Sequence, residues 1–181
     1  MSTLEPTPGQ TVGPFFGYAL PYDGDSELVP PGRADAVRLH GRVLDGAGDP
    51  VPDALVEIWQ ADAAGVVSRA AGSWHRDGFT FTGWGRAATD NAGTYTFSTV
   101  VPGATTPGHA PYVAVTVFAR GLLHRLLTRA YLPGPATDDD PFLASVDPAR
   151  RGTLVATADE HGFVFDIRLQ GEGETVFLTH G

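Results

Sequence analysis

Hydrophobic and polar residues alternate with a period of two along several short stretches of the chain. The alternation runs over residues 37–43, 55–60, 94–98 and 163–169. Successive side chains of a β-strand point to opposite faces, so this pattern predicts strands with one buried face. Turn-forming residues separate the stretches: DGAGDP at 45–50, DNAG at 90–93 and VPG at 101–103. Short strands joined in this way, with no alternation of strands and long helices, predict an all-β fold with a single-domain β-sandwich.

Two stretches depart from the alternating pattern. Asp147 can cap a helix and Pro148 suits its first turn, while Gly152 ends it, which predicts one short helix. The run GLLHRLLTRAYL at 121–132 fits both helical spacing and a pair of strands. We favour strands, because the run follows a β-rich segment and leads into a Pro-Gly turn.

The chain is expected to have two parts. Residues 1–35, with PTPGQTVGPFF and VPPG, read as an extended N-terminal arm that packs on a partner. Residues 36–181 form the β-sandwich domain, since no repeat, linker or low-complexity tract divides them. A length of 181 residues is enough to bury one hydrophobic core.

Composition narrows the classes of function. The net charge is −9, which argues against a nucleic-acid partner, because binding a phosphate backbone needs a concentrated basic surface. The absence of Cys excludes disulfides, thiolate metal sites and thiol nucleophiles. The first residues, MSTLEPTPGQ, do not resemble a secretory signal, and no apolar stretch approaches the roughly 18 residues of a membrane span. We therefore expect a cytoplasmic protein without a membrane or nucleic-acid partner.

Few motifs in the sequence carry chemistry. No two of the six His residues have the HxH or HxxxH spacing of a local metal site, and the GxSxG pattern of a serine hydrolase is absent. The stretch HAPYVAVTVFARG at 109–121 places an imidazole, His109, near a phenol, Tyr112, before a strand that ends at Arg120. These groups are compatible with a ferric site, with the remnant of one, or with ordinary packing.

Five segments together resemble the intradiol ring-cleavage dioxygenases. They are TPGQTVGPFF (7–16), RLHGRVLDGAGDPVPDALVEIWQADAAG (38–65), GWGRAATDNAGTYTF (83–97), APYVAVTVFARGLL (110–123) and FDIRLQGEGETVFL (165–178). The resemblance implies a β-sandwich and a non-haem ferric ion held by two Tyr and two His. It also implies insertion of dioxygen between the two hydroxyl-bearing carbons of a catechol.

The chain departs from the family at the expected ligands. The resemblance places Tyr112 and Ala114 where the two His ligands would be, and Thr105 where one Tyr ligand would be. The other Tyr ligand falls near Ser73, and residues 66–82 contain no Tyr. This implies a subunit that binds no metal and has no catalytic residue of its own. The cofactor Fe(III) is then expected in a partner β subunit.

The family resemblance also implies a role for two preserved motifs. In subunits of this kind the TVGP segment and the FARG arginine reach the partner's pocket, which assigns substrate binding to Thr11, Gly13, Pro14 and Arg120. A guanidinium suits a small aromatic acid, because it is a permanently charged donor for a carboxylate.

Two other hypotheses remain open at this stage. The chain could be a non-catalytic transthyretin-like binding or scaffold sandwich, or a self-sufficient homomeric dioxygenase. The preserved Thr11–Pro14 and Arg120 motifs favour the pocket-lining subunit over the scaffold. Ala114 and the lack of Tyr in residues 66–82 disfavour the homomeric enzyme.

Several polar and aromatic residues are expected to be structural. We predict that Glu57 forms a buried ion pair with an Arg residue and that Asp138–Asp140 is a solvated loop. The three tryptophans, Trp59, Trp74 and Trp84, are expected to anchor the core or an interface.

Overall fold

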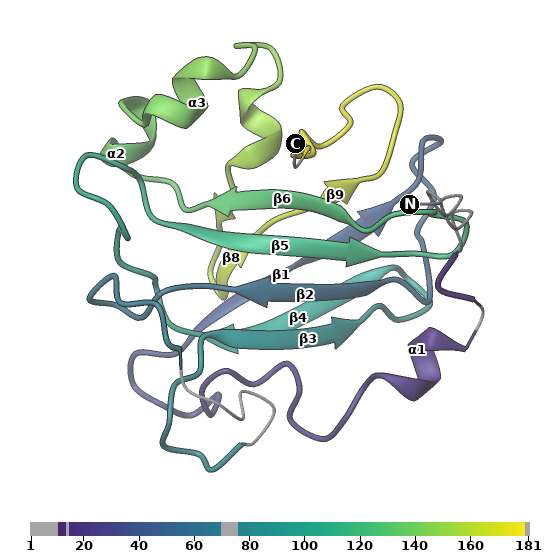
Figure 1. The fold of residues 1–181 in the computed structure, drawn as a ribbon, viewed down its shortest axis with the longest axis horizontal. Coiled ribbons are helices and arrows are strands. Elements are labelled where there is room, and N and C mark those ends of the chain that lie inside the picture. The colour runs from purple at the N-terminus through teal and green to yellow at the C-terminus, as the bar shows by residue number, and fades with distance from the viewer. Residues whose placement is uncertain (1–10, 14, 70–75, 180–181) are drawn as a thin grey trace, which may run out of the picture.

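Two β-sheets pack face to face in the computed structural model, which describes residues 11–13, 15–69 and 76–179 (Figure 1). One sheet has the order β4-β1-β8-β7, with β9 also paired to β1. The other has the order β3-β2-β5-β6 and is antiparallel throughout. The first sheet comprises β1 (Val37–Leu44), β4 (Thr94–Thr99), β7 (Thr157–Ala158), β8 (Gly162–Val164) and β9 (Ile167–Arg168). The second comprises β2 (Leu55–Trp59), β3 (Trp84–Ala88), β5 (Tyr112–Phe118) and β6 (Leu126–Tyr131). The predicted β-sandwich is confirmed.

The core lies between the sheets and follows from the two-residue period. In β5, the inward residues Val113, Val115 and Val117 are each at most 2% exposed. They pack in one cluster with residues of the opposite sheet such as Leu39 and Phe97. The outward residues of the same strands are therefore the only ones available for binding or chemistry.

Short helices cap the ends of the sandwich. They are α1 (Phe16–Ala19), α2 (Pro135–Asp138), α3 (Pro141–Ser145) and the 3-10 helix η1 (Arg151–Leu154). The helix predicted from Pro148 to Gly152 is instead a turn followed by η1, because the Asp147 carbonyl and side chain accept bonds from the next backbone N–H groups. The α-helices were not predicted, since four or five residues are too few to show a helical period.

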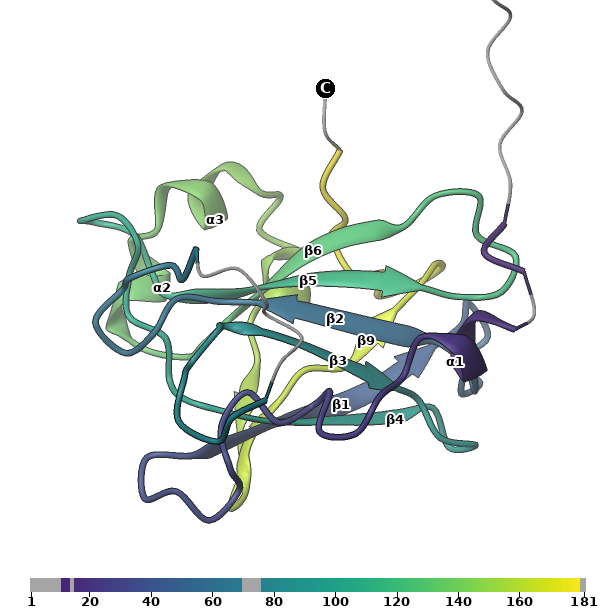
Figure 2. The same cartoon turned by 60° about the horizontal axis from the view of Figure 1, so that its bottom comes forward.

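The ambiguous run at 121–132 is resolved as the end of a β-hairpin. Residues 126–131 form β6, which pairs with β5 in the register Tyr112↔Tyr131 to Val117↔Leu126. Residues 119–125 make the connection at the same end of the sandwich as α1 (Figure 2). The strand prediction is therefore confirmed for the second half of the run. No helix among the described residues is long and apolar enough to cross a membrane.

The predicted ion pair of Glu57 is also present. Arg86 of β3 lies directly opposite Glu57 of β2 and donates from Nε and Nη2 to Oε1 at 3.0 and 2.5 Å. The Arg86 side chain is 6% exposed and that of Glu57 is 20% exposed. Arg86 Nη1 also donates to the carbonyl of Leu20 at 2.8 Å. One guanidinium therefore joins two strands to the segment that follows α1.

Replacing Glu57 by Ala should destabilise the sandwich strongly. The substitution leaves the Arg86 charge buried without its carboxylate, which costs about 3 kcal/mol of the free energy of unfolding. Urea denaturation measures this loss. Glu174→Ala is the matched control, because its pair with Arg150 is exposed and should contribute less than about 1 kcal/mol. An equal loss of unfolding free energy in the two variants would show that the buried pair contributes no more to stability than the exposed one.

Candidate functional site

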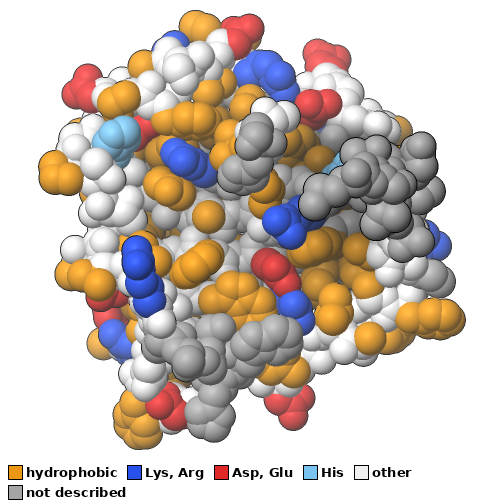
Figure 3. Space-filling model, in the orientation of Figure 1, with side chains coloured by type: hydrophobic (Ala, Val, Ile, Leu, Met, Phe, Trp, Pro, Cys, Tyr) orange, Lys and Arg blue, Asp and Glu red, His pale blue; other side chains and the backbone are white. Residues whose placement is uncertain are grey.

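A cross-strand row of side chains runs over the outer face of the β3-β2-β5-β6 sheet. The register aligns Trp84 with Trp59, Trp59 with Ala114, and Ala114 with Arg129. Trp59 is 52% exposed, so its indole belongs to the surface and not to the core. Figure 3 shows this face, where hydrophobic side chains gather with a few charged ones among them. The small side chain of Ala114 leaves a hollow in the middle of the row.

This hollow is a cavity of about 200 Å³. Its lining comprises Trp59, Gln60, Ala61, Val67, Thr105, Tyr112 and Ala114. Three of these, Thr105, Tyr112 and Ala114, are the described positions that the resemblance aligns with metal ligands. The structure therefore brings them together, although they come from a loop and a strand. Ser73 and Trp74 lie outside the described residues.

The donor groups of this cavity do not suit a ferric ion. Of the three aligned positions, only Tyr112 offers a phenol, while Thr105 has an aliphatic hydroxyl and Ala114 a methyl group. Gln60 cannot take their place, because its amide nitrogen donates to the carbonyls of Ala61 and Val100 and its oxygen accepts from Thr99. Among the described residues no cluster of three or more His, Cys, Asp or Glu could hold a metal.

Tyr112 is held by its neighbours as a packed aromatic ring. The guanidinium of Arg129 lies 4.3 Å from the centre of its ring, and Tyr131 packs at 5.5 Å between ring centres. Arg129 also donates to the Tyr131 hydroxyl at 3.0 Å. Burial raises the pKa of Tyr131, so this second phenol stays neutral. These contacts give Tyr112 a structural role, so of the alternatives that the sequence left open for this stretch they favour packing.

His109 faces a buried carboxylate, and this corrects the prediction of a solvated acidic loop. Its Nδ1 lies 3.4 Å from Asp140, whose side chain is 1% exposed. Asp140 caps α3 by accepting from the N–H groups of Phe142 and Leu143, and it also accepts from Ala110 at 2.9 Å. Asp138 and Asp139 are exposed as predicted, but Asp138 is the last residue of α2, so the loop placement holds for Asp139 alone. The Asp140 carboxylate ties the start of β5 to α3.

A second, larger hollow lies where the N-terminal arm meets the β5–β6 hairpin. This groove has a volume of about 510 Å³. Its lining comprises Val12, Phe118, Ala119, Leu122, Leu123, His124, Arg125, Leu127 and Leu178. Both ribbon views show the first described residues beside this hairpin (Figures 1 and 2). The arm and the hairpin motif therefore share one end of the molecule.

The predicted substrate-binding residues occupy this end in different ways. Thr11 and Gly13 flank Val12, and the Thr11 hydroxyl accepts a bond from the Gly13 N–H at 3.4 Å. Gly13 has a φ of 77°, a conformation that glycine adopts without strain. Pro14 lies outside the described residues. Arg120 is not part of the groove lining, because its guanidinium turns toward Asp53 and forms an ion pair with it.

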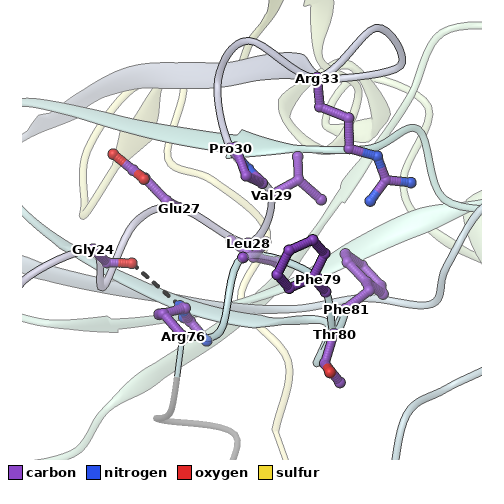
Figure 4. Close-up of a pocket in the computed structure, with 11 residues that line it drawn as sticks. Gly24, Glu27, Leu28, Val29, Pro30, Arg33, Arg76, Phe79, Thr80 and Phe81 are labelled. Atoms are coloured by element: carbon purple, nitrogen blue, oxygen red, sulfur yellow. Dashed lines mark hydrogen bonds between the residues drawn. The ribbon is translucent and has the colours of Figure 1, made fainter.

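A third cavity, between residues 24–33 and 76–81, is structural. It measures about 60 Å³, which is too small for an aromatic acid. Figure 4 shows Arg76 at its edge, with a hydrogen bond of 3.2 Å from Nε to the carbonyl of Gly24. The same guanidinium donates to the carbonyls of Asp25 and Trp84. Arg76 thus fastens residues 24 and 25 to β3.

Comparison with known proteins decides the family. A family model described as a dioxygenase matches residues 12–110. The protocatechuate 3,4-dioxygenase alpha chain of Burkholderia cepacia is 39% identical over 197 residues, which cover 98% of this chain and 99% of the relative. The chain belongs to the intradiol dioxygenase family. The beta chain from the same organism is 36% identical, over 78% of this chain and 67% of the relative.

Solved structures agree with the sandwich. The dioxygenase domain of a dioxygenase and carbohydrate-binding protein fusion from Streptomyces sp. SirexAA-E is 27% identical, with a TM-score of 0.58. The match covers 92% of this chain and 99% of that domain. Intradiol dioxygenases in general depend on iron. Within this family the present chain is distinguished by a cavity whose described donors do not suit that ion.

Two acidic residues of these sites escaped the sequence prediction. Asp140 precedes Pro141, which is the same capping signal that was recognised at Asp147 and Pro148, so the signal was available. Asp53 follows Pro52 in a turn and gives no sign that it will meet Arg120, 67 residues later in the chain. Contacts of this range depend on the strand order, which the alternating pattern does not encode.

Replacing Asp140 by Asn should remove a pH-dependent part of the stability. Burial raises the pKa of this carboxyl, but bonds from the N–H groups of Leu143, Ala110 and Phe142 give a net shift downward. A lowered pKa in the folded state stabilises the protein above the ordinary pKa of about 3.9, and the contribution is lost as pH falls through the folded value.

Unfolding followed between about pH 7 and pH 2.5 tests the role of Asp140. The stability difference between the parent protein and Asp140→Asn should be constant above about pH 5 and shrink below pH 4. Asp139→Asn is the matched control, because Asp139 is exposed. A difference that stays constant down to the lowest pH would contradict the assignment.

Proposed function

We propose that this chain is the alpha subunit of a protocatechuate 3,4-dioxygenase. In this complex an iron-bearing beta subunit cleaves 3,4-dihydroxybenzoate with O2 to 3-carboxy-cis,cis-muconate, in the β-ketoadipate route of aromatic-acid degradation. The observation that carries the proposal is a near full-length match to an alpha chain, combined with a ligand-deficient cavity at the family's metal position. A cytoplasmic location is proposed with it, in keeping with a chain that contains no Cys.

The proposed partner is homologous to this chain. Since the beta chain relative is 36% identical, the two subunits should share one sandwich and pair about a pseudo-twofold axis. Exposed aromatic residues support a protein-protein interface: Phe15 is 75% exposed, Tyr18 85%, Trp59 52% and Phe79 92%. Large aromatic side chains of this kind are enriched at interfaces. Residues 1–35 are proposed to act as an arm that packs on the partner.

In the proposed complex, this chain binds and orients the substrate. The ferric ion, which the partner would hold, supplies a Lewis acid for the catechol oxygens. Thr11, Gly13 and Pro14 form the arm segment that would line the partner's pocket. Arg120 offers a charged donor to the ring carboxylate of 3,4-dihydroxybenzoate, and its side chain is 66% exposed and so accessible from the partner.

Expression of the chain alone and together with its cognate beta chain tests the division of labour. The chain alone should bind no iron and show no O2 uptake with 3,4-dihydroxybenzoate. The co-purified pair should contain iron and be active. Metal analysis and an oxygen electrode supply the two measurements. An iron-loaded, active lone chain would overturn the proposal and support a homomeric enzyme, whereas a chain that ignores the beta chain would support a scaffold.

Arg120→Gln should weaken substrate binding in the complex without preventing assembly. Loss of a hydrogen bond to a charged group predicts a rise in KM for 3,4-dihydroxybenzoate of about tenfold to hundredfold. The KM for catechol, which has no carboxylate, should change much less. Size-exclusion chromatography checks assembly, and steady-state O2 uptake gives both constants. Unchanged KM values for both substrates would remove Arg120 from the pocket.

A further inference from the structure

We propose that Asp53 is a positioning residue that orients Arg120 and thereby sets the preference of the complex for carboxylated catechols. The inference rests on the proposed function, because it concerns the residue assigned there to the substrate carboxylate. It concerns a residue of the turn before β2 that neither the sequence motifs nor the family match assign to the site. Three observations support it: the backbone conformation of Asp53, the geometry of its ion pair and its place beside α1.

The backbone at Asp53 is held in an unfavourable conformation. Its φ is 65°, and among the described residues no other non-glycine residue has a positive φ. Asp53 follows Pro52 in a turn, an arrangement in which the residue after proline is usually Gly. Aspartate is one of the few non-glycine residues that tolerate this conformation, but glycine would adopt it without strain, so the turn alone does not require an aspartate. Strain of this kind is concentrated at functional sites, where a side chain has a task.

The task indicated by the structure is to hold Arg120. Asp53 Oδ2 accepts a hydrogen bond from Arg120 Nη2, and in the described part of the chain no other side-chain hydrogen bond of Arg120 is found. Arg120 lies in the turn after β5, and its long side chain is 66% exposed. The contact is made at one end of the guanidinium fork. Nη2 carries a second N–H group, so one edge of the guanidinium, either Nε with Nη2 or Nη1 with Nη2, is left for a carboxylate to bind two parallel N–H groups.

Asp53 also lies against helix α1. A Cβ built on Gly17 of α1 would be 3.8 Å from the Asp53 Cβ and from its carbonyl oxygen. Asp53 therefore stands between α1 and the hairpin that carries Arg120. The turn thus joins Arg120 to α1, the helix that lies two residues after the assigned segment at 11–14.

Two opposing effects decide what removal of the Asp53 charge does to substrate binding. The carboxylate repels an anionic substrate, but the Arg120 guanidinium neutralises its charge in the ion pair, so this repulsion is weak. Without Asp53 the guanidinium is unrestrained, and each binding event must order a long side chain. We expect the second effect to dominate, because the ion pair is a direct contact and the repulsion acts over a longer distance. Asp53→Asn should therefore weaken binding.

The test compares variants of this chain in the complex with its beta chain. Asp53→Asn keeps a residue that tolerates positive φ, and Asp53→Gly relieves the turn, so both should fold and assemble. Each should raise the KM for 3,4-dihydroxybenzoate about threefold to tenfold, with kcat unchanged and the KM for catechol within about twofold. Asp53→Glu, which keeps a carboxylate, should raise this KM less than Asp53→Asn does. Glu174→Gln, which removes a charge from a distant exposed pair, should change neither constant.

A double-substitution cycle separates this inference from the proposed function. If Asp53 acts through Arg120, Asp53→Asn should add nothing to the KM of Arg120→Gln. A selective effect of Arg120→Gln with none of Asp53→Asn would overturn the positioning role alone. An Asp53→Asn effect that persists without Arg120, or that is equal for both substrates, would also overturn it. No effect of either substitution would reject the substrate-binding role of Arg120 and with it this inference.

Discussion

The two-residue period of strand β5 is the constraint on which the rest of the structure depends. Val113, Val115 and Val117 must face inward to fill the space between the sheets. The residues between them are thereby forced onto the outer face, where they carry no core packing. Ala114 can consequently stand, without loss of the sandwich, at a position that the family resemblance aligns with a metal ligand. Because inward and outward residues alternate along β5, substitutions on its outer face can change the chemistry of that face while the core stays packed.

Charged groups that are buried in this chain serve to join segments. Arg86 links β2 and β3 to the carbonyl of Leu20, and Arg76 links residues 24 and 25 to β3. Asp140 performs the corresponding task at the opposite end, between the start of β5 and α3. Unsatisfied charges would be costly in these places, so each carries several hydrogen bonds. Residues 20–25, which follow α1, are thus fixed to the sheet that carries the β5–β6 hairpin.

The sequence predicted those features that depend on local pattern. Strands β1, β2 and β4, the turns and the need of Glu57 for a cationic partner all follow from neighbouring residues. The partner itself, Arg86, lies 29 positions away and could not be named, because register is a property of the paired strands. The burial of Asp140 was missed for a related reason: its carboxylate is enclosed by β5, which is distant in sequence. The cavity beside Ala114 is lined by Thr105, Tyr112 and Ala114. Only the family resemblance indicated that these three positions would lie together.

The backbone conformation differs between the Ala114 cavity and the Asp53 turn. The Ala114 cavity lies on unstrained strands and lacks the donors of a metal site, so nothing in its backbone indicates a task. The Asp53 turn is different, because it keeps a positive φ without glycine and orients an arginine at the exposed end of the hairpin. Glycine or asparagine would also satisfy this turn, so its geometry alone does not require an aspartate. The aspartate at this turn supports the proposal that this subunit acts at the arm and hairpin end and not at the cavity.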